Sequence, residues 1–519
     1  MSAELGTFDY VVVGGGSAGC ALAARLSEDP SVTVCLLEAG PSDVDDPAIL
    51  NLTDWMALLD SGYDWDYVVE PQERGNGFLR HARAKVLGGC SSHNSCIAFW
   101  TPREDLDEWA AFVGDTGWTA DACWPLIRRL ENNDGEWDGH GRSGPVTIHH
   151  IDPDDPCGVA VLEAAAAVGL PTVRFNEGST VREGAGFFQI NREPDGTRAS
   201  SSHAYLHPVL DSRRNLEVRT GAWASKVLVD GGRATGVEYQ QDIGPGRVTV
   251  AARREVVLCT GAIDTPKLLM LSGIGPGEHL REHGIDVLVD APGVGSNLDD
   301  HVEGLVMWEA ARPMVTRSTQ WWEIGLFTRT APGLDRPDLM MHYGSVPFDL
   351  NTVRWGYPTT DNGFCLTPNV TRGRSRGTVR LRTRDFRDRP RVDPRYFTDP
   401  EDHDMRVMTH GIRLARRIAE QPALKEWVAR ELAPGPEAVT DEEIADYVTK
   451  THNTVYHPAC TARMGPDGDP GAVVDPQLRV RGVAGLRVAD ASVMPFLPAI
   501  NPNITVMMIG EKAADLLRS

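Results

Sequence analysis

The sequence lacks the cysteine patterns that stabilise disulfide-rich and zinc-binding folds. None of its nine cysteines forms a C-x-x-C pair, and their number is odd. A disulfide framework or a zinc site is therefore not expected, and reduced thiols in a cytoplasmic setting fit better. Also missing is any apolar run near the roughly 18 residues that a membrane span requires. The first residues lack a basic region followed by an apolar stretch, so we expect neither a signal peptide nor a membrane anchor.

Positive charge is scarce. The chain has 51 Lys and Arg against 73 Asp and Glu, which gives a formal net charge of −22 at pH 7. Nucleic acid and an anionic membrane surface would both repel such a protein, so neither is expected as a partner. A small cationic substrate is compatible with this charge, although acidic enzymes commonly carry it for solubility alone.

Length and N-terminal pattern indicate an α/β protein. A chain of 519 residues is too long for one ordinary core, so two domains or one large interleaved α/β body is expected. The stretch "FDYVVVGGGSAGCALAARLSED" reads as a buried strand, a glycine turn at Gly14, Gly16 and Gly19, and a helix. A second strand then ends in Glu38, about 20 residues further on, where a carboxylate can accept hydrogen bonds from a ribose. This order predicts a dinucleotide site with the pyrophosphate at the helix N-terminus.

The rest of the chain predicts a second, inserted domain. Residues from about 150 to 200 read as polar loops, and residues 215–260 as alternating strands. Strand-like segments and amphipathic helices follow from about 303 to 450, and the C-terminal residues read as strand, loop and helix. We therefore expect the last sixty or so residues to complete the N-terminal nucleotide unit.

Four stretches carry a family resemblance: "VVVGGGSAG", "ARAKVLGGCSSHN", "TGAIDTPKLLMLSGIGP" and "GLRVADASVMP". They resemble the glucose–methanol–choline (GMC) oxidoreductases, which are FAD enzymes, from about residue 8 to residue 517. Words such as "GCSSHNSCIAFW", "STQWWEIG" and "KTHNTVYHP" resemble the choline-oxidising branch of that family. The resemblance implies an α/β fold with a Rossmann-like FAD-binding domain (1–153, 194–302 and 455–519) and an interleaved α+β substrate domain built on an antiparallel sheet (154–193 and 303–454).

His93 lies in "SSHNS", between bare glycine and serine positions. The resemblance implies that this histidine is joined covalently to the flavin, while the small neighbours let the main chain run against the ring. An electron-withdrawing link would make the ring a better hydride acceptor. The alternative is a histidine that is merely hydrogen-bonded in a polar loop.

The resemblance also implies the active-site residues. His457 would be the general base or the electrostatic partner of the alkoxide, Asn501 would donate a hydrogen bond, and His342 would steady the alkoxide. A quaternary ammonium is recognised by aromatic faces and a carboxylate. The positions that match this recognition are Trp55, Trp322 and Tyr456 as an aromatic box, Glu303 as counter-charge, and Ser95 and His301 beside them.

The FAD contacts implied by the family extend along the chain. They are Gly14, Gly16, Ser17, Ala18 and Gly19 at the pyrophosphate, Glu38 at the ribose, Trp65, Gly89, Asn94, Ser95, Cys96 and Ile97 along the flavin, Ala224 near adenine, Asp490 near the phosphates or ribityl chain, and Pro502 next to the ring. No metal is expected.

Two stretches depart from the family pattern. Cys460 stands where glycine is usual, and "FLPAI" at 496–500 is more apolar than expected. Both flank the expected flavin position, so we expect them to affect which alcohol is preferred more than the class of reaction. A nucleophilic role for Cys460 is not expected, because the sequence places no base for it.

The function expected from the resemblance is oxidation of choline to betaine aldehyde and then to glycine betaine, with O2 reduced to H2O2, by a cytoplasmic homodimer. Alternatives within the family are a dehydrogenase that passes electrons to a quinone or dye, an oxidase of another primary alcohol, and an FAD-containing lyase. A nicotinamide enzyme is disfavoured, because FAD accounts for the only dinucleotide pattern.

Overall fold

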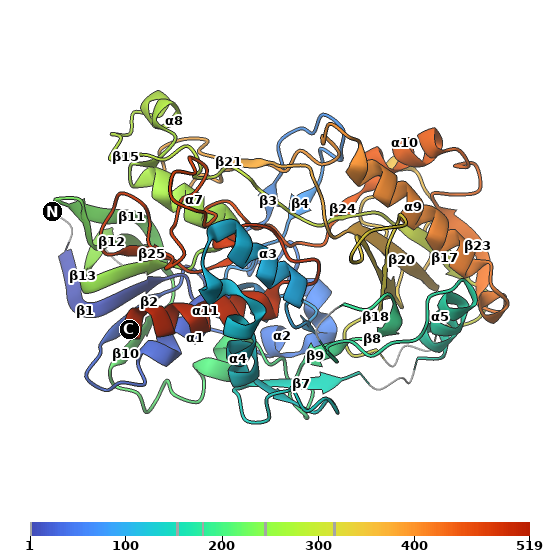
Figure 1. The fold of residues 1–519 in the computed structure, drawn as a ribbon, viewed down its shortest axis with the longest axis horizontal. Coiled ribbons are helices and arrows are strands. Elements are labelled where there is room, and N and C mark those ends of the chain that lie inside the picture. Colours follow the sequence, from blue (N-terminus) through green and yellow to red (C-terminus); the bar gives the residue numbers. More distant parts are fainter. Residues whose placement is uncertain (1–2, 152–154, 179–180, 243–245, 315–317) are drawn as a thin grey trace.

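The computed structural model describes residues 3–151, 155–178, 181–242, 246–314 and 318–519. The molecule is elongated, with one large sheet toward each end (Figure 1). The expected domain boundary between residues 153 and 154 lies outside the described residues.

A seven-stranded sheet forms the end that carries both termini (Figure 1). Its order is β10-β2-β1-β13-β12-β11, and β25 also pairs with β13. The pairs β10–β2, β2–β1, β1–β13 and β13–β25 are parallel, whereas β11, β12 and β13 are joined antiparallel. The strands are β1 (Ala3–Val13), β2 (Val34–Leu37), β10 (Leu216–Arg219), β11 (Ala222–Asp230), β12 (Arg233–Gln241), β13 (Arg247–Leu258) and β25 (Leu486–Val488).

Segments from the two ends of the chain complete this unit. Helix α1 (Ser17–Leu26) follows β1 directly, and α11 (Asn503–Arg518) packs against it. Strand β25 adds to the sheet beside β13, and α7 (Gly261–Leu271) follows β13. The C-terminal strand and helix that the sequence predicted therefore pack against β13 and α1.

An eight-stranded sheet occupies the other end. Its order is β23-β17-β20-β19-β18-β8, with β16 pairing with β20 and β24, and all of these pairs are antiparallel. The amphipathic helix α9 (His403–Ala419) packs against β20, β19 and β17, and α10 (Asp441–Thr451) packs against α9. The strands are β8 (Gly184–Phe187), β16 (Val302–Glu303), β17 (Val306–Ala310), β18 (Trp322–Thr328), β19 (Leu339–Gly344), β20 (Gly363–Val370), β23 (Val428–Ala433) and β24 (Asn453–Thr454).

The interpretation of residues 150–200 as loops was wrong. Helix α5 (Pro156–Ala167) lies there, followed by β8 and β9 (Gln189–Asn191). Asp155, the last residue before α5, is the N-terminal cap of this helix, since its side chain accepts from the Cys157 N–H and Pro156 occupies the first turn. Strand β9 joins a four-stranded sheet, β5-β9-β7-β6, that the sequence did not reveal.

The remaining elements are short or lie on the periphery. The helices are α2 (Pro47–Leu50), α3 (Arg103–Val113), α4 (Ala120–Leu130), α6 (Ser201–Tyr205) and α8 (Gly277–Glu282); the strands are β3 (Tyr67–Val68), β4 (Arg80–His81), β5 (Ile97–Ala98), β6 (Glu131–Asn133), β7 (Val146–His150), β14 (Ile274–Gly275), β15 (Val289–Asp290), β21 (Thr378–Arg380) and β22 (Arg391–Asp393); the 3-10 turns are η1 (Leu52–Leu58), η2 (Gly89–Ser92), η3 (Thr116–Trp118), η4 (Val353–Trp355), η5 (Pro422–Leu424) and η6 (Ala491–Val493).

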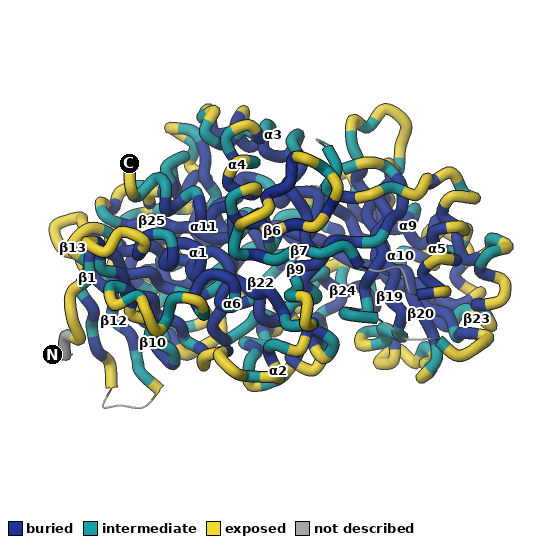
Figure 2. The backbone as a smooth tube through the Cα atoms, turned by 90° about the horizontal axis from the view of Figure 1, so that it is seen from below, coloured by how far each residue is buried: buried dark blue, intermediate teal, exposed yellow. Residues whose placement is uncertain are grey.

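Burial follows the two large sheets. One hydrophobic core surrounds the seven-stranded sheet and another lies between the eight-stranded sheet and its helices, while exposed residues gather in the peripheral loops (Figure 2). Within the described parts of the chain, no helix is long and apolar enough to cross a membrane.

Candidate active site

One cavity is lined from both large sheets and from the segment that contains His93. It begins at the end of β1 and reaches β16, β18 and β19 of the other sheet. Of the residues predicted from the sequence, those that line it are Gly14, Gly16, Ser17, Ala18, Glu38, Trp55, Trp65, Gly89, His93, Asn94, Ser95, Ile97, Ala224, Glu303, Trp322, His342, Tyr456, His457, Asp490, Asn501 and Pro502. Gly19, Cys96 and His301 lie behind its wall.

Glycines shape the end of the cavity next to α1. Gly14 has a φ of +100°, and a Cβ on Gly89 would lie 2.6 Å from the Cα of Gly16. Two backbone segments therefore touch where no side chain fits. Gly19, expected at the pyrophosphate, does not line the cavity but serves packing, because a Cβ there would lie 1.9 Å from the carbonyl oxygen of Gly14.

Glu38 follows β2 and is buried. Its two carboxylate oxygens each accept a hydrogen bond of 2.8 Å, one from the Gly15 N–H and one from the Gly40 N–H. Burial raises the pKa of Glu38 to about 7. The carboxylate is thus fixed at the edge of the cavity, where an acceptor for a ribose was predicted.

Trp65, Trp223 and Lys267 line the cavity near Ala224, and Lys85, outside the lining, contacts the Trp65 ring. The rings of Trp65 and Trp223 are 5.0 Å apart, with Lys85 Nζ 4.9 Å from the Trp65 ring and Lys267 Nζ 5.5 Å from the Trp223 ring. The sequence analysis missed Trp223, Lys85 and Lys267. The signal for Trp223 was its place directly before Ala224; the lysines had none.

Asp490 and Ser17 anchor the cavity wall between its two ends. Asp490 accepts from the Gly261 N–H at 2.9 Å and from the Thr265 hydroxyl at 2.6 Å. The Ser17 hydroxyl donates to Asn503 Oδ1 at 2.8 Å. These bonds join α1 to α11 and the start of η6 to α7.

His93 lies at the end of η2 and is buried. Its Nε2 is 3.1 Å from the Leu58 carbonyl oxygen and 3.8 Å from Asp64 Oδ2. Burial lowers the pKa of His93 to about 4, so the imidazole is neutral at neutral pH. Cys96 turns away from the cavity, because its Sγ lies 3.2 Å from Nη1 of the buried Arg198.

The catalytic candidates gather at the other end. His457 Nδ1 lies 2.9 Å from His301 Nδ1, so the two imidazoles share one hydrogen bond. Burial is the main cause that lowers the pKa of His301 to about 3, that of His342 to about 4, and that of His457 well below 6.5. All three rings are therefore neutral at neutral pH. His342 Nε2 and Asn501 Oδ1 are buried without hydrogen-bond partners among the described residues.

An aromatic corner faces these groups. The rings of Trp55 and Trp322 meet edge to face at 5.7 Å and 71°, and the Trp55 indole N–H donates to the Gln320 carbonyl oxygen at 2.8 Å. Phe348 adds a third ring, 5.3 Å from Trp322. Phe348 was missed, because its contact with Trp322 joins residues that are distant in the sequence.

Glu303 places a carboxyl group in the same part of the cavity. Its Oε2 is 3.5 Å from Asn453 Nδ2, and its Oε1 is 3.8 Å from His342 Nδ1. Burial raises the pKa of Glu303 to about 8. No Lys or Arg within the described chain pairs with this carboxyl group.

The two departures from the family pattern have different structural settings. Cys460 is buried with a φ of +71°, a conformation that favours glycine, and burial raises the pKa of its thiol well above 9. Residues 496–500 lie behind Asn501: the Phe496 carbonyl oxygen accepts from Trp109, and the Ala499 N–H donates to Asp105. Neither departure lines the cavity.

Comparison with known proteins identifies the family. Two models described as GMC oxidoreductase match residues 8–303 and 373–510. The chain belongs to the GMC oxidoreductases. It is therefore a flavin-dependent oxidoreductase that acts on alcohols, as the resemblance implied.

GMC oxidoreductases from several organisms resemble this chain over nearly its full length. Choline oxidase from Arthrobacter globiformis is 65% identical over 99% of this chain and 94% of its own. The crystal structure of pyridoxine 4-oxidase from "Mesorbium loti" superposes with a TM-score of 0.90 at 34% identity, covering 98% of both chains. A formate oxidase variant from Aspergillus oryzae, studied for FAD modification, gives a TM-score of 0.89 at 27% identity, covering 100% of this chain and 99% of its own.

The cavity fits FAD. A Cβ on Gly261, which has a φ of +81° and lines the cavity, would meet nothing within 4 Å, so the wall is open there. Buried polar atoms without partners lie along the same wall, at Asn503 Nδ2, His342 Nε2 and Asn501 Oδ1. Such groups are costly unless a ligand pairs with them. Among the described residues, no group of three or more His, Cys, Asp or Glu is placed to hold a metal ion.

Proposed function

We propose that this enzyme is an FAD-dependent oxidase of choline, which converts choline to betaine aldehyde and the hydrated aldehyde to glycine betaine, with O2 reduced to H2O2. The observation that carries this proposal is Glu303, a buried carboxyl group that shares its cavity with an aromatic corner and the neutral histidines His342 and His457. The 65% identity to a choline oxidase supports it.

Glu303 suits a cation that cannot donate a hydrogen bond. A buried carboxylate without a cationic partner is unfavourable, and the raised pKa of Glu303 reports that cost. A quaternary ammonium would supply the missing charge, while the faces of Trp55 and Trp322 would contact its methyl groups. An uncharged alcohol would leave Glu303 protonated and would gain nothing from it.

The histidines and Asn501 suit removal of the hydroxyl proton. We propose that the Nδ1–H of His457 donates a hydrogen bond to Nδ1 of His301. This leaves Nε2 of His457 free to accept the proton of the alcohol. Asn501 and His342 would then stabilise the alkoxide by hydrogen bonds. FAD, when bound, supplies the ring that takes the carbon-bound hydrogen as hydride. The two electrons and two protons released from each CH–OH group balance the reduction of one O2 to H2O2.

We further propose that His93 carries the flavin covalently. Its imidazole is neutral, lines the cavity and follows the glycine turn at 88–89, which supports close approach of the ring. Acid-precipitated wild-type protein should keep its yellow colour, and His93→Ala should give a colourless pellet and a yellow supernatant. A colourless wild-type pellet would reject the link.

Three further expectations stay predictions from the family resemblance: the homodimer, the cytoplasmic location and the division of the chain into two domains. We propose that division as 1–153, 194–302 and 455–519 against 154–193 and 303–454. Its support is that the strands of the seven-stranded sheet fall in the first group, and those of the eight-stranded sheet in the second apart from Val302 of β16.

The test compares choline with 3,3-dimethylbutan-1-ol, in which carbon replaces the charged nitrogen. Oxygen consumption and H2O2 release should be far faster with choline, and two O2 should be consumed for each choline carried to glycine betaine. Oxidation that needs an added dye or quinone would indicate a dehydrogenase instead. Equal rates on both alcohols would remove the ammonium site, and cleavage of a cyanohydrin without flavin reduction would indicate a lyase.

A further inference from the structure

The backbone of residues 454–457 is strained where it passes the proposed substrate. Tyr456 has a φ of +63°, in the left-handed region that is unfavourable for a residue with a Cβ. Tyr456 and His457 both line the cavity. Surrounding contacts must therefore hold this conformation, because an isolated chain would relax from it.

A buried carboxylate lies behind this segment. Asp300 accepts a hydrogen bond from the Thr454 hydroxyl at 2.5 Å and another from the backbone N–H of His457 at 2.9 Å. The hydroxyl of Tyr396 also donates to it, and His81 Nε2 lies 3.4 Å away. Asp300 has a side-chain exposure of 1% and does not line the cavity.

Thr454 connects Asp300 to Tyr456. Its hydroxyl oxygen accepts the Tyr456 N–H at 2.7 Å. Since a hydroxyl has a single proton and Thr454 gives it to Asp300, the direction of both bonds is fixed. Asp300 thus holds the His457 amide directly and the Tyr456 amide through Thr454. Arg83 adds a bond from the other side, donating to the Tyr456 carbonyl oxygen at 2.7 Å.

From these contacts we infer that Asp300 and Thr454 are positioning residues, which hold Tyr456 and His457 in place for the oxidation of an amine alcohol. The inference rests on the proposed function for the roles of those two side chains. The carboxylate–hydroxyl–amide chain itself is independent of that function. Thr454 should matter mainly for the cation, through Tyr456, whereas Asp300 should matter for every alcohol, through His457.

The test uses Thr454→Val, which keeps the shape and removes the hydroxyl, and Thr454→Ser, which keeps the hydroxyl. Thr454→Val should lower kcat/KM for choline about tenfold, chiefly by raising KM, because a buried hydrogen bond to a strained amide is lost. Activity on 3,3-dimethylbutan-1-ol should change less than threefold. Thr454→Ser should stay within about twofold of wild type on both alcohols.

Two further variants complete the design. Thr451→Val is the matched control, because Thr451 is equally buried but bonds only within its own helix, to the Tyr447 carbonyl oxygen; its kinetics should equal those of wild type. Asp300→Asn should lower kcat on choline and on the neutral alcohol by similar factors. Flavin absorbance and thermal unfolding show which variants are folded. If Asp300→Asn does not fold, the comparison of Thr454→Val with Thr454→Ser still tests the inference.

Two outcomes would overturn the inference: Thr454→Val kinetics equal to wild type, or Thr454→Ser as impaired as Thr454→Val. Wild-type protein that fails to oxidise choline would instead contradict the proposed function. In that case the same variants, measured on whichever alcohol the wild type oxidises, still test whether the Thr454 hydroxyl and Asp300 position Tyr456 and His457.

Discussion

Glu303 places a carboxyl group where burial makes its ionisation costly. Its pKa of about 8 means that the side chain is largely protonated at neutral pH until a cation arrives. Binding of a quaternary ammonium should therefore release a proton from the protein. The residue proposed to recognise the substrate should also destabilise the free protein at alkaline pH.

Replacing Glu303 by Gln should separate charged from neutral substrates. Glu303→Gln removes the counter-charge and keeps the shape, so kcat/KM for choline should fall by about 100-fold or more, mostly through KM. The value for 3,3-dimethylbutan-1-ol should stay within a few-fold of wild type. Steady-state kinetics on an oxygen electrode measure both, and equal losses on the two alcohols would remove the ammonium-pairing role.

The same substitution should change how stability depends on pH. The pKa of Glu303 is raised from 4.5 to about 8 in the folded protein. Its contribution to the free energy of unfolding is therefore fully present below pH 4.5 and is lost as the pH rises through about 8. Without choline, Glu303→Gln should match wild type in Tm at pH 5 and exceed it by a few degrees at pH 9. Differential scanning calorimetry at both pH values tests this, and an equal difference at both would be inconsistent with a buried, titrating Glu303.

At this scale, the sequence revealed the residues that match a known family role and missed residues whose importance depends on tertiary contacts. His457 and Asn501 were found because each sits in a family motif, and both line the cavity. Phe348 and Asp300 were not assigned, because their importance comes from neighbours distant in the sequence: Phe348 meets Trp322, and Asp300 meets Thr454. A left-handed conformation at Tyr456 is likewise a tertiary property that its letter does not predict.

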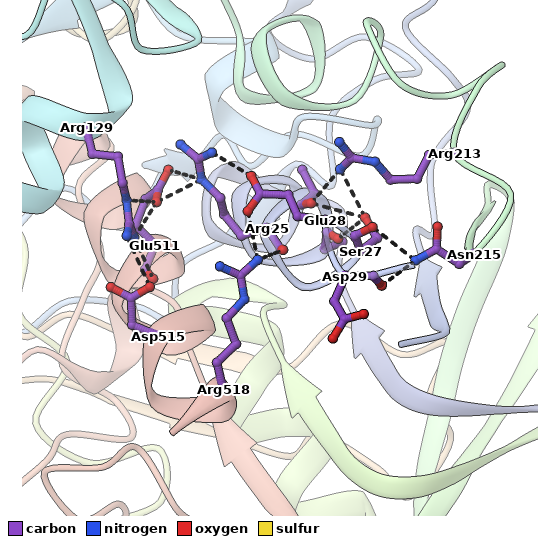
Figure 3. A network of polar contacts seen from close by, with 12 residues as sticks. Arg25, Ser27, Glu28, Asp29, Arg129, Arg213, Asn215, Glu511, Asp515 and Arg518 are labelled. Carbon is purple, nitrogen blue, oxygen red and sulfur yellow. Dashed lines mark hydrogen bonds and ion pairs between the residues drawn. The ribbon is translucent and has the colours of Figure 1, made fainter. Parts of the chain in front are cut away.

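Among the secondary-structure elements, α1, α4 and α11 are joined by a buried carboxylate. Glu511 of α11 accepts from Arg25 of α1 at 2.9 Å and from Arg129 of α4 at 2.7 Å (Figure 3). Its side chain is fully buried, and the hydroxyl of the buried Tyr205 also donates to it. Asp515, one turn later, takes a second bond from Arg129 at the surface (Figure 3).

Substitutions at these two positions should differ greatly in cost. Glu511→Ala leaves two arginines and a tyrosine without their common acceptor, and should destabilise the protein by about 3–5 kcal/mol. Asp515→Ala, which removes a half-exposed ion pair, should cost less than about 1 kcal/mol. Denaturant unfolding followed by fluorescence compares them, and similar midpoints for the two variants would contradict the central role of Glu511.

Secondary structure was predictable where pattern and packing agree. The run β1–α1–β2 and the strands between residues 216 and 258 were predicted, since apolar runs and glycine turns mark them. Helix α5 was missed for two reasons. Its residues are mostly small and apolar on every face, so they show no amphipathic helical pattern, and the polar residue that caps it was interpreted as part of a loop. The pairing of β9 with β5 and β7 joins segments far apart in the chain, which no local pattern encodes.

On the scale of the whole molecule, the net charge of −22 should concentrate cations around the protein. Raising the ionic strength from about 10 mM to 500 mM screens this field, so kcat/KM for choline should fall by about threefold. The neutral isostere should be unaffected. Stopped-flow reduction at several salt concentrations, with both alcohols, measures the difference, and parallel curves would mean that the field plays no part.

The close contact between Gly16 and Gly89 limits which residues of the cavity wall can be substituted. Two backbone segments meet there without side chains between them. Any larger residue at Gly89 would push the two segments apart and change the shape of the proposed FAD site. At the opposite end the wall consists of side chains such as Trp322 and Phe348, whose ring centroids lie 5.3 Å apart. Substitutions intended to change the preferred alcohol should therefore begin at Trp322 and Phe348 and should leave Gly16 and Gly89 unchanged.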